Sequence, residues 1–134
     1  MKKILVAGAS VYGLENISDD AMLYSWVCAL KKKIDITVTL MMRHVPSYLE
    51  TYPIDNFIEN LDYQLKSHSQ GKRFRGLNLK DPSNHLHKIL KEIQESDLLI
   101  IGGDPFIEIT LAPYRGILPY TELLILLAKF SNTP

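Results

Sequence analysis

Two short, wholly apolar runs, one near each end of the chain, organise the pattern of hydrophobic and polar residues. Ile4–Ala7 and Leu98–Ile101 are each followed directly by glycine. A continuous apolar run bounded by a turn residue is typical of a strand with both faces covered, as in the middle of a parallel sheet. Ile34–Met42 is rich in β-branched residues and predicts a further strand, and Ile54–Ile58 is a shorter candidate.

Between these strands the apolar residues change to helical spacing. The first helix is predicted from about Asp19 to Lys32, with Ser18 as a candidate N-cap because its hydroxyl can accept from a first-turn amide. The last predicted helix, Pro119–Phe130, is apolar almost all round, which indicates burial on more than one side. A further helix is predicted between the first and the last. The apolar face of the first helix comprises Met22, Leu23, Trp26, Val27 and Leu30, and that of the middle helix comprises Leu86, Ile89, Leu90 and Ile93.

Alternation of strands and helices predicts an α/β fold with three layers and a mostly parallel sheet, because parallel strands need crossover connections. We expect residues 1–134 to form a single Rossmann-like domain. Another strand would be expected after the last helix, where the chain instead stops. The sequence therefore suggests the N-terminal portion of a longer two-domain protein.

Composition narrows the functional classes. Fifteen basic and fifteen acidic residues cancel, so net charge gives no case for a nucleic-acid partner. The single cysteine, Cys28, falls on the apolar stripe of the first helix and is interpreted as a buried thiol in a reducing compartment. Neither a signal peptide nor a membrane span is recognisable, since the N-terminal apolar run is too short. A cytoplasmic protein is expected.

Ligands of open α/β sheets bind outside the carboxyl ends of the strands, where the strand order reverses. We expect that reversal between Ile4–Ala7 and Leu98–Ile101, so the loops that follow them should face one crevice. The polar residues of these loops are Asn16, Ser18, Asp19 and Asp20 on one side, and Asp104, Glu108, Thr110 and Arg115 on the other.

The glycine spacing does not favour a dinucleotide in this crevice. Gly8 and Gly13 do not form GxGxxG, and no GK[ST] follows. Asp19 and Asp20 would compete with a pyrophosphate for the helix amides. Carboxylates suit a polyhydroxy ligand better, and one of them could act as a general base. Alternatively, these two aspartates are only favourable helix-start residues.

No metal site is expected, because no carboxylate or cysteine accompanies His85 and His87 at a zinc-like spacing. No cofactor is expected either.

The segment ENISDDAML resembles a motif close to G-N-x-G-D-E-A that is typical of the polysaccharide pyruvyl transferase family. Its matching residues are Asn16, Asp19 and Ala21; Asp20 replaces the glutamate, and Glu15 and Ser18 replace the two glycines. The segments SDLLIIGGDPFIEI and LLILLAKF are similar to the family's later strand, glycine cluster and apolar helix, with Asp104-Pro105 replacing further glycines. The resemblance spans nearly the whole chain.

This resemblance implies a transferase that moves a pyruvyl group from phosphoenolpyruvate to a sugar of a cell-surface polysaccharide precursor. The implied fold is the N-terminal half of a GT-B-type two-domain enzyme, with a C-terminal domain supplying much of the donor site; this half alone would be inactive. Asp19 or Asp104 would be the general base. The implied substrate-binding residues are Asn16, Ser18, Asp20, Gly102, Gly103 and Arg115.

Two other interpretations stay open. One is a glycosyltransferase-like half that uses a nucleotide-sugar donor. The other is a non-catalytic, flavodoxin-like interaction domain. The apolar last helix is, in addition, a candidate surface for pairing with a second copy of the chain.

Overall fold

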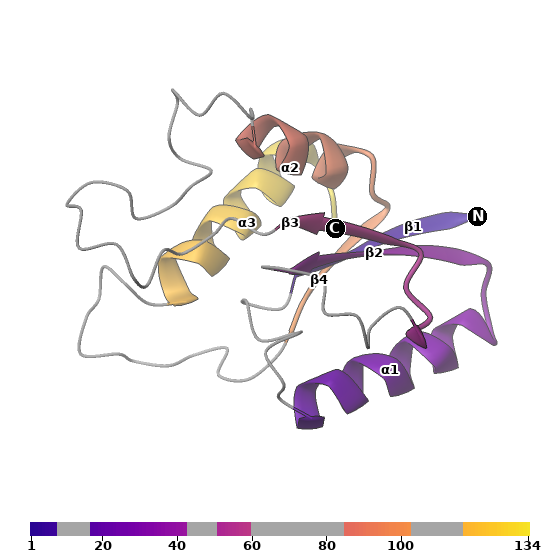
Figure 1. Ribbon diagram of the computed structural model, residues 1–134. Coiled ribbons are helices and arrows are strands. Elements are labelled where there is room, and N and C mark those ends of the chain that lie inside the picture. Colours follow the sequence, from indigo (N-terminus) through magenta and orange to yellow (C-terminus); the bar gives the residue numbers. More distant parts are fainter. Residues whose placement is uncertain (8–16, 43–50, 60–84, 103–116) are drawn as a thin grey trace.

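The computed structural model describes residues 1–7, 17–42, 51–59, 85–102 and 117–134. Within these ranges the chain forms three helices and one four-stranded sheet with the strand order β3-β2-β1-β4 (Figure 1). All three strand pairings are parallel. The elements are β1 (Lys2–Ala7), α1 (Ile17–Lys31), β2 (Ile36–Met42), β3 (Asn56–Glu59), α2 (His85–Gln94), β4 (Leu98–Ile101) and α3 (Ile117–Ser131).

β1 lies at the centre of this sheet. Leu5 is opposite Thr39 of β2 on one side and Leu99 of β4 on the other. The run Ile4–Ala7 is buried throughout, as its apolar sequence predicts for an inner strand. Full burial of a valine, leucine or isoleucine side chain is worth about 1.5–3 kcal/mol, so Ile4, Leu5 and Val6 each contribute to the stability of the domain.

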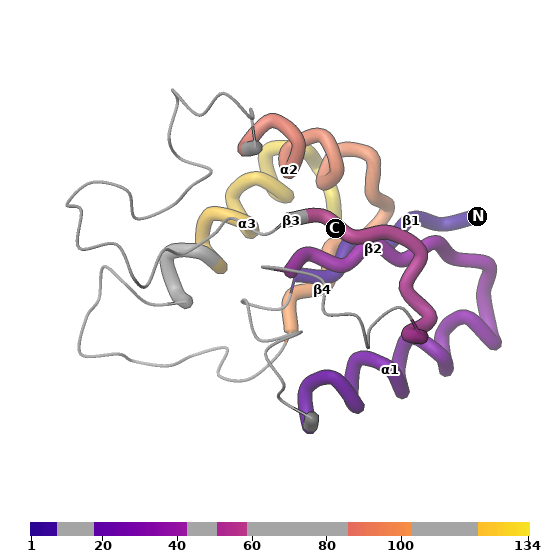
Figure 2. The backbone as a smooth tube through the Cα atoms, in the orientation of Figure 1, coloured from indigo at the N-terminus to yellow at the C-terminus, as the bar shows by residue number. Residues whose placement is uncertain are grey.

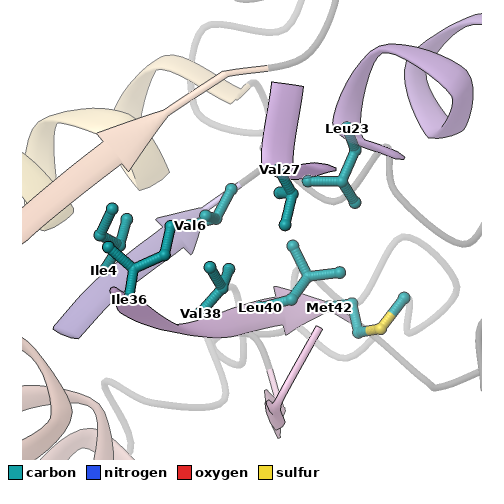
Figure 3. Close-up of a cluster of buried hydrophobic side chains, with 8 residues drawn as sticks. All are labelled: Ile4, Val6, Leu23, Val27, Ile36, Val38, Leu40 and Met42. Carbon is teal, nitrogen blue, oxygen red and sulfur yellow. The ribbon is translucent and has the colours of Figure 1, made fainter. Parts of the chain in front are cut away.

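Alternate residues of the strands face two separate apolar clusters. Ile4 and Val6 point toward α1 and contribute to the first cluster, drawn in Figure 3. Leu5 and Ala7 point to the opposite face and contribute to a second cluster with α2 and α3. The sheet is therefore the middle of three layers, with α1 on one side and α2 and α3 on the other (Figure 1).

The predicted α/β class and mostly parallel sheet are confirmed, as is the predicted apolar face of α2, which packs on the sheet.

Details of α1 differ from the sequence prediction. Met22 is exposed, because the side of the helix that packs on the sheet is centred on Leu23 and Val27. Cys28 is half-buried and not fully buried, since it lies at the border of that side. None of the helices in the described part of the chain is long and apolar enough to cross a membrane.

α3 is buried on one side only, which corrects the prediction that its apolar residues are covered on several sides. Leu124 and Ala128 pack in the second cluster. Ile125, Leu126 and Phe130 are 50%, 63% and 79% exposed. The reason is that α2 and the sheet cover one face of α3, and no described element covers the opposite face.

α3 ends in a Schellman motif. Asn132 has a φ of 56°, in the left-handed region that asparagine tolerates better than most residues. Its amide donates to the carbonyl oxygen of Lys129 (3.2 Å), and the amide of Thr133 donates to that of Ala128 (2.9 Å). These two bonds satisfy carbonyls that a helix end would otherwise leave unpaired.

The motif turns the chain back toward the sheet. Thr133 Oγ1 donates to the carbonyl oxygen of Ile93 near the end of α2 (2.9 Å). The amide of Leu99 donates to the carbonyl oxygen of Pro134 (2.8 Å). The residues after α3 therefore lie beside β4, on the side opposite β1, and Figure 2 traces this return.

A partly buried ion pair joins α1 to the connection that precedes β3. Asp55 accepts from Lys31 Nζ at 2.6 and 2.7 Å and from the amide of Val38 at 2.7 Å. Burial alone would raise the pKa of the Asp55 carboxyl, but the hydrogen bonds from Lys31 and Val38 outweigh it and lower the pKa below its ordinary value. The folded state therefore favours the ionised carboxylate.

We expect Asp55→Asn to lower the free energy of unfolding by about 1 kcal/mol at neutral pH, because the Asp55 side chain is 38% exposed and its ion pair is screened by solvent. The carboxylate stabilises the fold above its unfolded-state pKa of about 3.9 and stops doing so as pH falls through its lower folded-state pKa. Urea unfolding at several pH values measures this effect.

The matched control is Asp35→Asn, because the Asp35 side chain is almost fully exposed. Its effect should be small at every pH. An Asp55→Asn deficit that persisted unchanged well below pH 3 would contradict this account of the ion pair.

Candidate functional site

The carboxyl ends of β1 and β4 lie side by side. Ala7 is opposite Ile101, and the amide of Gly102 donates to the carbonyl oxygen of Ala7 (3.0 Å). β2 and β3 lie on one side of β1 and β4 on the other, so the strand order reverses between β1 and β4. The predicted position of the reversal is confirmed, and it is where open α/β sheets bind ligands.

The structure describes half of the eight candidate site residues. Ser18, Asp19 and Asp20 are in the first turn of α1, and Gly102 directly follows β4. The described ranges do not include Asn16, Gly103, Asp104 and Arg115. The roles of these four residues stay predictions from the sequence.

The two aspartates of α1 are buried. Asp19 is 1% exposed and Asp20 is 4% exposed, although both are at the first turn of a helix. The positive end of the helix dipole stabilises negative charge there. Both residues also have interaction partners in the fold. Their position in the first turn supports the helix-start interpretation.

Ser18 differs from its predicted role. The helix begins at Ile17, so Ser18 is already inside the first turn and is not the residue that caps it. Its side chain is exposed and has an interaction partner of its own. The apolar Ile17 extends the helix further back than the polar Ser18-Asp19-Asp20 sequence suggested.

An aromatic pair beside these carboxylates was not identified from the sequence. The rings of Tyr24 and Tyr52 have centroids 5.3 Å apart and meet edge to face at 82°. Burial raises the pKa of the Tyr52 hydroxyl, and the negative charge of Asp20 and the neighbouring Tyr24 raise it further. Tyr52 also packs against the first apolar cluster. The pair therefore adjoins the same end of α1 as the candidate aspartates.

The signal for this pair was weak in the sequence. Tyr24 lies off the apolar stripe of α1, and Tyr52 belongs to a stretch with no clear periodicity. Only the fold brings the two tyrosines together, since all of β2 lies between them in the chain.

The chemistry available in the described part of the site is that of hydrogen-bond acceptors and aromatic rings. Carboxylates can accept hydrogen bonds from hydroxyl groups, and an ionised carboxylate forms stronger bonds than a neutral acceptor. Among the described residues, no group of three His, Cys, Asp or Glu side chains is arranged to hold a metal ion.

Comparisons with protein-family models, with curated proteins and with solved structures find no match to this chain.

We expect Asp20→Asn to lower the pKa of Tyr52, because the substitution removes a negative charge that disfavours the phenolate. The decrease should be partial, since burial, the larger cause, is unchanged. NMR titration of ring-labelled tyrosine between pH 8 and 12 measures the change, given an ordinary tyrosine pKa of about 10.

Glu95→Gln provides the control, because Glu95 interacts with Lys3 at the opposite end of the sheet. This substitution also removes one negative charge, and it should leave the pKa of Tyr52 unchanged. Equal shifts in the two variants would show that Asp20 has no specific influence on the ring.

Proposed function

We propose that this domain is the acceptor-binding half of a sugar-modifying transferase of the polysaccharide pyruvyl transferase type. The observation that carries the proposal is the alignment of the β1 and β4 carboxyl ends at the reversal of the strand order. The order β3-β2-β1-β4 is also that of the first four strands of a doubly wound Rossmann sheet. This order supports a Rossmann-like half of a two-domain enzyme.

The carboxylates of α1 support a sugar in preference to a phosphate as the ligand. Asp19 and Asp20 bring two acidic side chains to the first turn of the helix that follows β1. An anionic ligand would meet their negative charge at the place where helix amides otherwise bind phosphate. A sugar would instead donate its hydroxyl hydrogens to carboxylate oxygens, which requires that the buried side chains of Asp19 and Asp20 become accessible when the sugar binds.

In the proposed reaction, two sugar hydroxyls and phosphoenolpyruvate give a pyruvate ketal and inorganic phosphate. Both hydroxyl oxygens form bonds to C2 of the three-carbon unit, and the bond between C2 and the phosphate oxygen breaks. One hydroxyl proton is balanced by protonation of the methylene carbon, and the other leaves with phosphate. Asp19 or Asp104 would accept a hydroxyl proton as general base.

A second domain would supply the donor site, as the family resemblance implies. The proposal therefore assigns to this chain sugar binding without turnover. It also includes self-association of the chain through α3, whose outward apolar side chains are exposed.

We expect the chain to bind oligosaccharides that carry neighbouring free hydroxyls, with amide shifts at Asp19, Asp20 and Gly102 in a two-dimensional NMR titration. Asp19→Asn should weaken this binding about tenfold, because a hydrogen bond to a charged group contributes about 1.5–3 kcal/mol. Glu95→Gln, at the other end of the sheet, should bind as the wild type does. Thermal unfolding of each variant checks that the fold is retained.

Two results would count against the proposal. Stabilisation by nucleotide sugars, with no effect of simple oligosaccharides, would favour a glycosyltransferase-like half. Oligosaccharide binding that left the three named amides unchanged would place the sugar elsewhere.

In a protein that joins this domain to a donor domain, phosphate release from phosphoenolpyruvate should require a sugar acceptor.

A further inference from the structure

α3 has an outward surface of mixed character, which we call the outer face of α3. Thr121, Leu124 and Ala128 are buried and define the inward side of the helix. With 100° between successive residues, the exposed side chains between residues 121 and 131 all fall within one arc of about 140° of the helix surface. The outer face consists of Glu122, Ile125, Leu126, Lys129 and Phe130.

Two residues of opposite charge lie at equal distances on either side of the apolar centre of this face. Glu122 and Lys129 are seven residues apart and so lie two turns from each other on one line along the helix. Ile125 and Leu126 lie between them. The face therefore reads acidic, apolar, apolar, basic from its N-terminal to its C-terminal end.

We propose that the outer face of α3 binds the same face of a second copy of this chain, with the two helices antiparallel. A two-fold axis midway between Ile125 and Leu126 brings Glu122 opposite Lys129 of the second copy, and gathers Ile125 and Leu126 of both copies around the axis. Each contact then occurs twice, once from each copy. The two opposite-charge pairs then lie about one helical turn above and below the central apolar contact.

Charge selects the antiparallel arrangement. In a parallel pair in register, Glu122 would lie opposite Glu122 and Lys129 opposite Lys129, and such like-charge pairs are destabilising. An arbitrary partner would need a matching pattern of its own, whereas this pattern is complementary to itself when reversed. That self-complementarity identifies the partner as a second copy.

The exposed apolar side chains supply the driving force. Ile125 and Leu126 are each at least half exposed, and the neighbouring Phe130 is more exposed still. A contact of about two helical turns is smaller than the roughly 1,200 Å² of a standard stable interface. We therefore expect a reversible dimer that forms as concentration rises.

The inference deepens the proposed self-association and does not rest on sugar binding, so either can fail while the other holds. Sedimentation equilibrium of the full chain over micromolar to millimolar concentration measures the dimer. Glu122→Lys places lysines opposite lysines, and Lys129→Glu places glutamates opposite glutamates. Each variant alone should dimerise at least about tenfold more weakly than the wild type.

An equimolar mixture of the two single variants should recover association, because the lysine introduced by Glu122→Lys in one chain then faces the glutamate introduced by Lys129→Glu in the other. The double variant E122K/K129E should dimerise with itself for the same reason. All substituted side chains are exposed, so the fold should be unaffected. Lys32→Glu, an equal charge change at an exposed residue after α1, should leave dimerisation unchanged.

A wild-type chain that stays monomeric up to millimolar concentration would overturn the proposal. So would a mixture that associates no better than the single variants. Dimerisation that Lys32→Glu weakens as much as Lys129→Glu would show that net charge, and not the α3 pairing, controls association.

Discussion

The pairing of β1 with a strand on each side is the interaction on which the rest of the structure depends. Its residues Ile4–Ala7 are buried, and its two faces separate the two apolar clusters. A strand in that position needs apolar residues at every site, because its alternating side chains enter different cores. α1 is held against one face and α2 and α3 against the other only while β1 occupies the centre.

The same pairing determines where a ligand could bind. Since β1 and β4 are parallel and in register from Ile4 to Ala7, their carboxyl ends finish at one edge of the sheet. α1 is the next described element after β1, and its first turn carries two buried aspartates. The position of this edge is thus a consequence of strand order and of the parallel pairing.

The sequence was most informative where burial alone determines which residue types a segment can contain. The continuous apolar runs predicted the positions of β1 and β4 closely, but the expected full burial holds only for β1, because β4 is the last strand of the described sheet and is only partly buried. The spacing of Ile89 and Ile93 predicted the buried side of α2. The apolar composition of α3 could not predict which of its side chains are buried. An apolar residue in the sequence does not show whether another part of the same chain, or a partner, packs against it. Exposed Leu126 and Phe130 show that difference.

The candidate site was predictable only in part. The apolar strands indicated its position, and the polar residues at the start of α1 indicated its acidic side. Tyr52 was missed because its nearness to Asp20 and Tyr24 depends on tertiary structure and leaves no periodic signal. Local polarity predicts a helix cap at Ser18, whereas the fold begins the helix earlier, at the apolar Ile17.

Native-state hydrogen exchange of the β1 amides tests the central claim most directly. If β1 is the inner strand on which both layers depend, the amides of Leu5, Val6 and Ala7 should exchange only through global unfolding, with the free energy measured by denaturant. They should be the slowest class in the sheet. Exchange of these β1 amides through local opening, at a free energy well below that of global unfolding, would contradict the account.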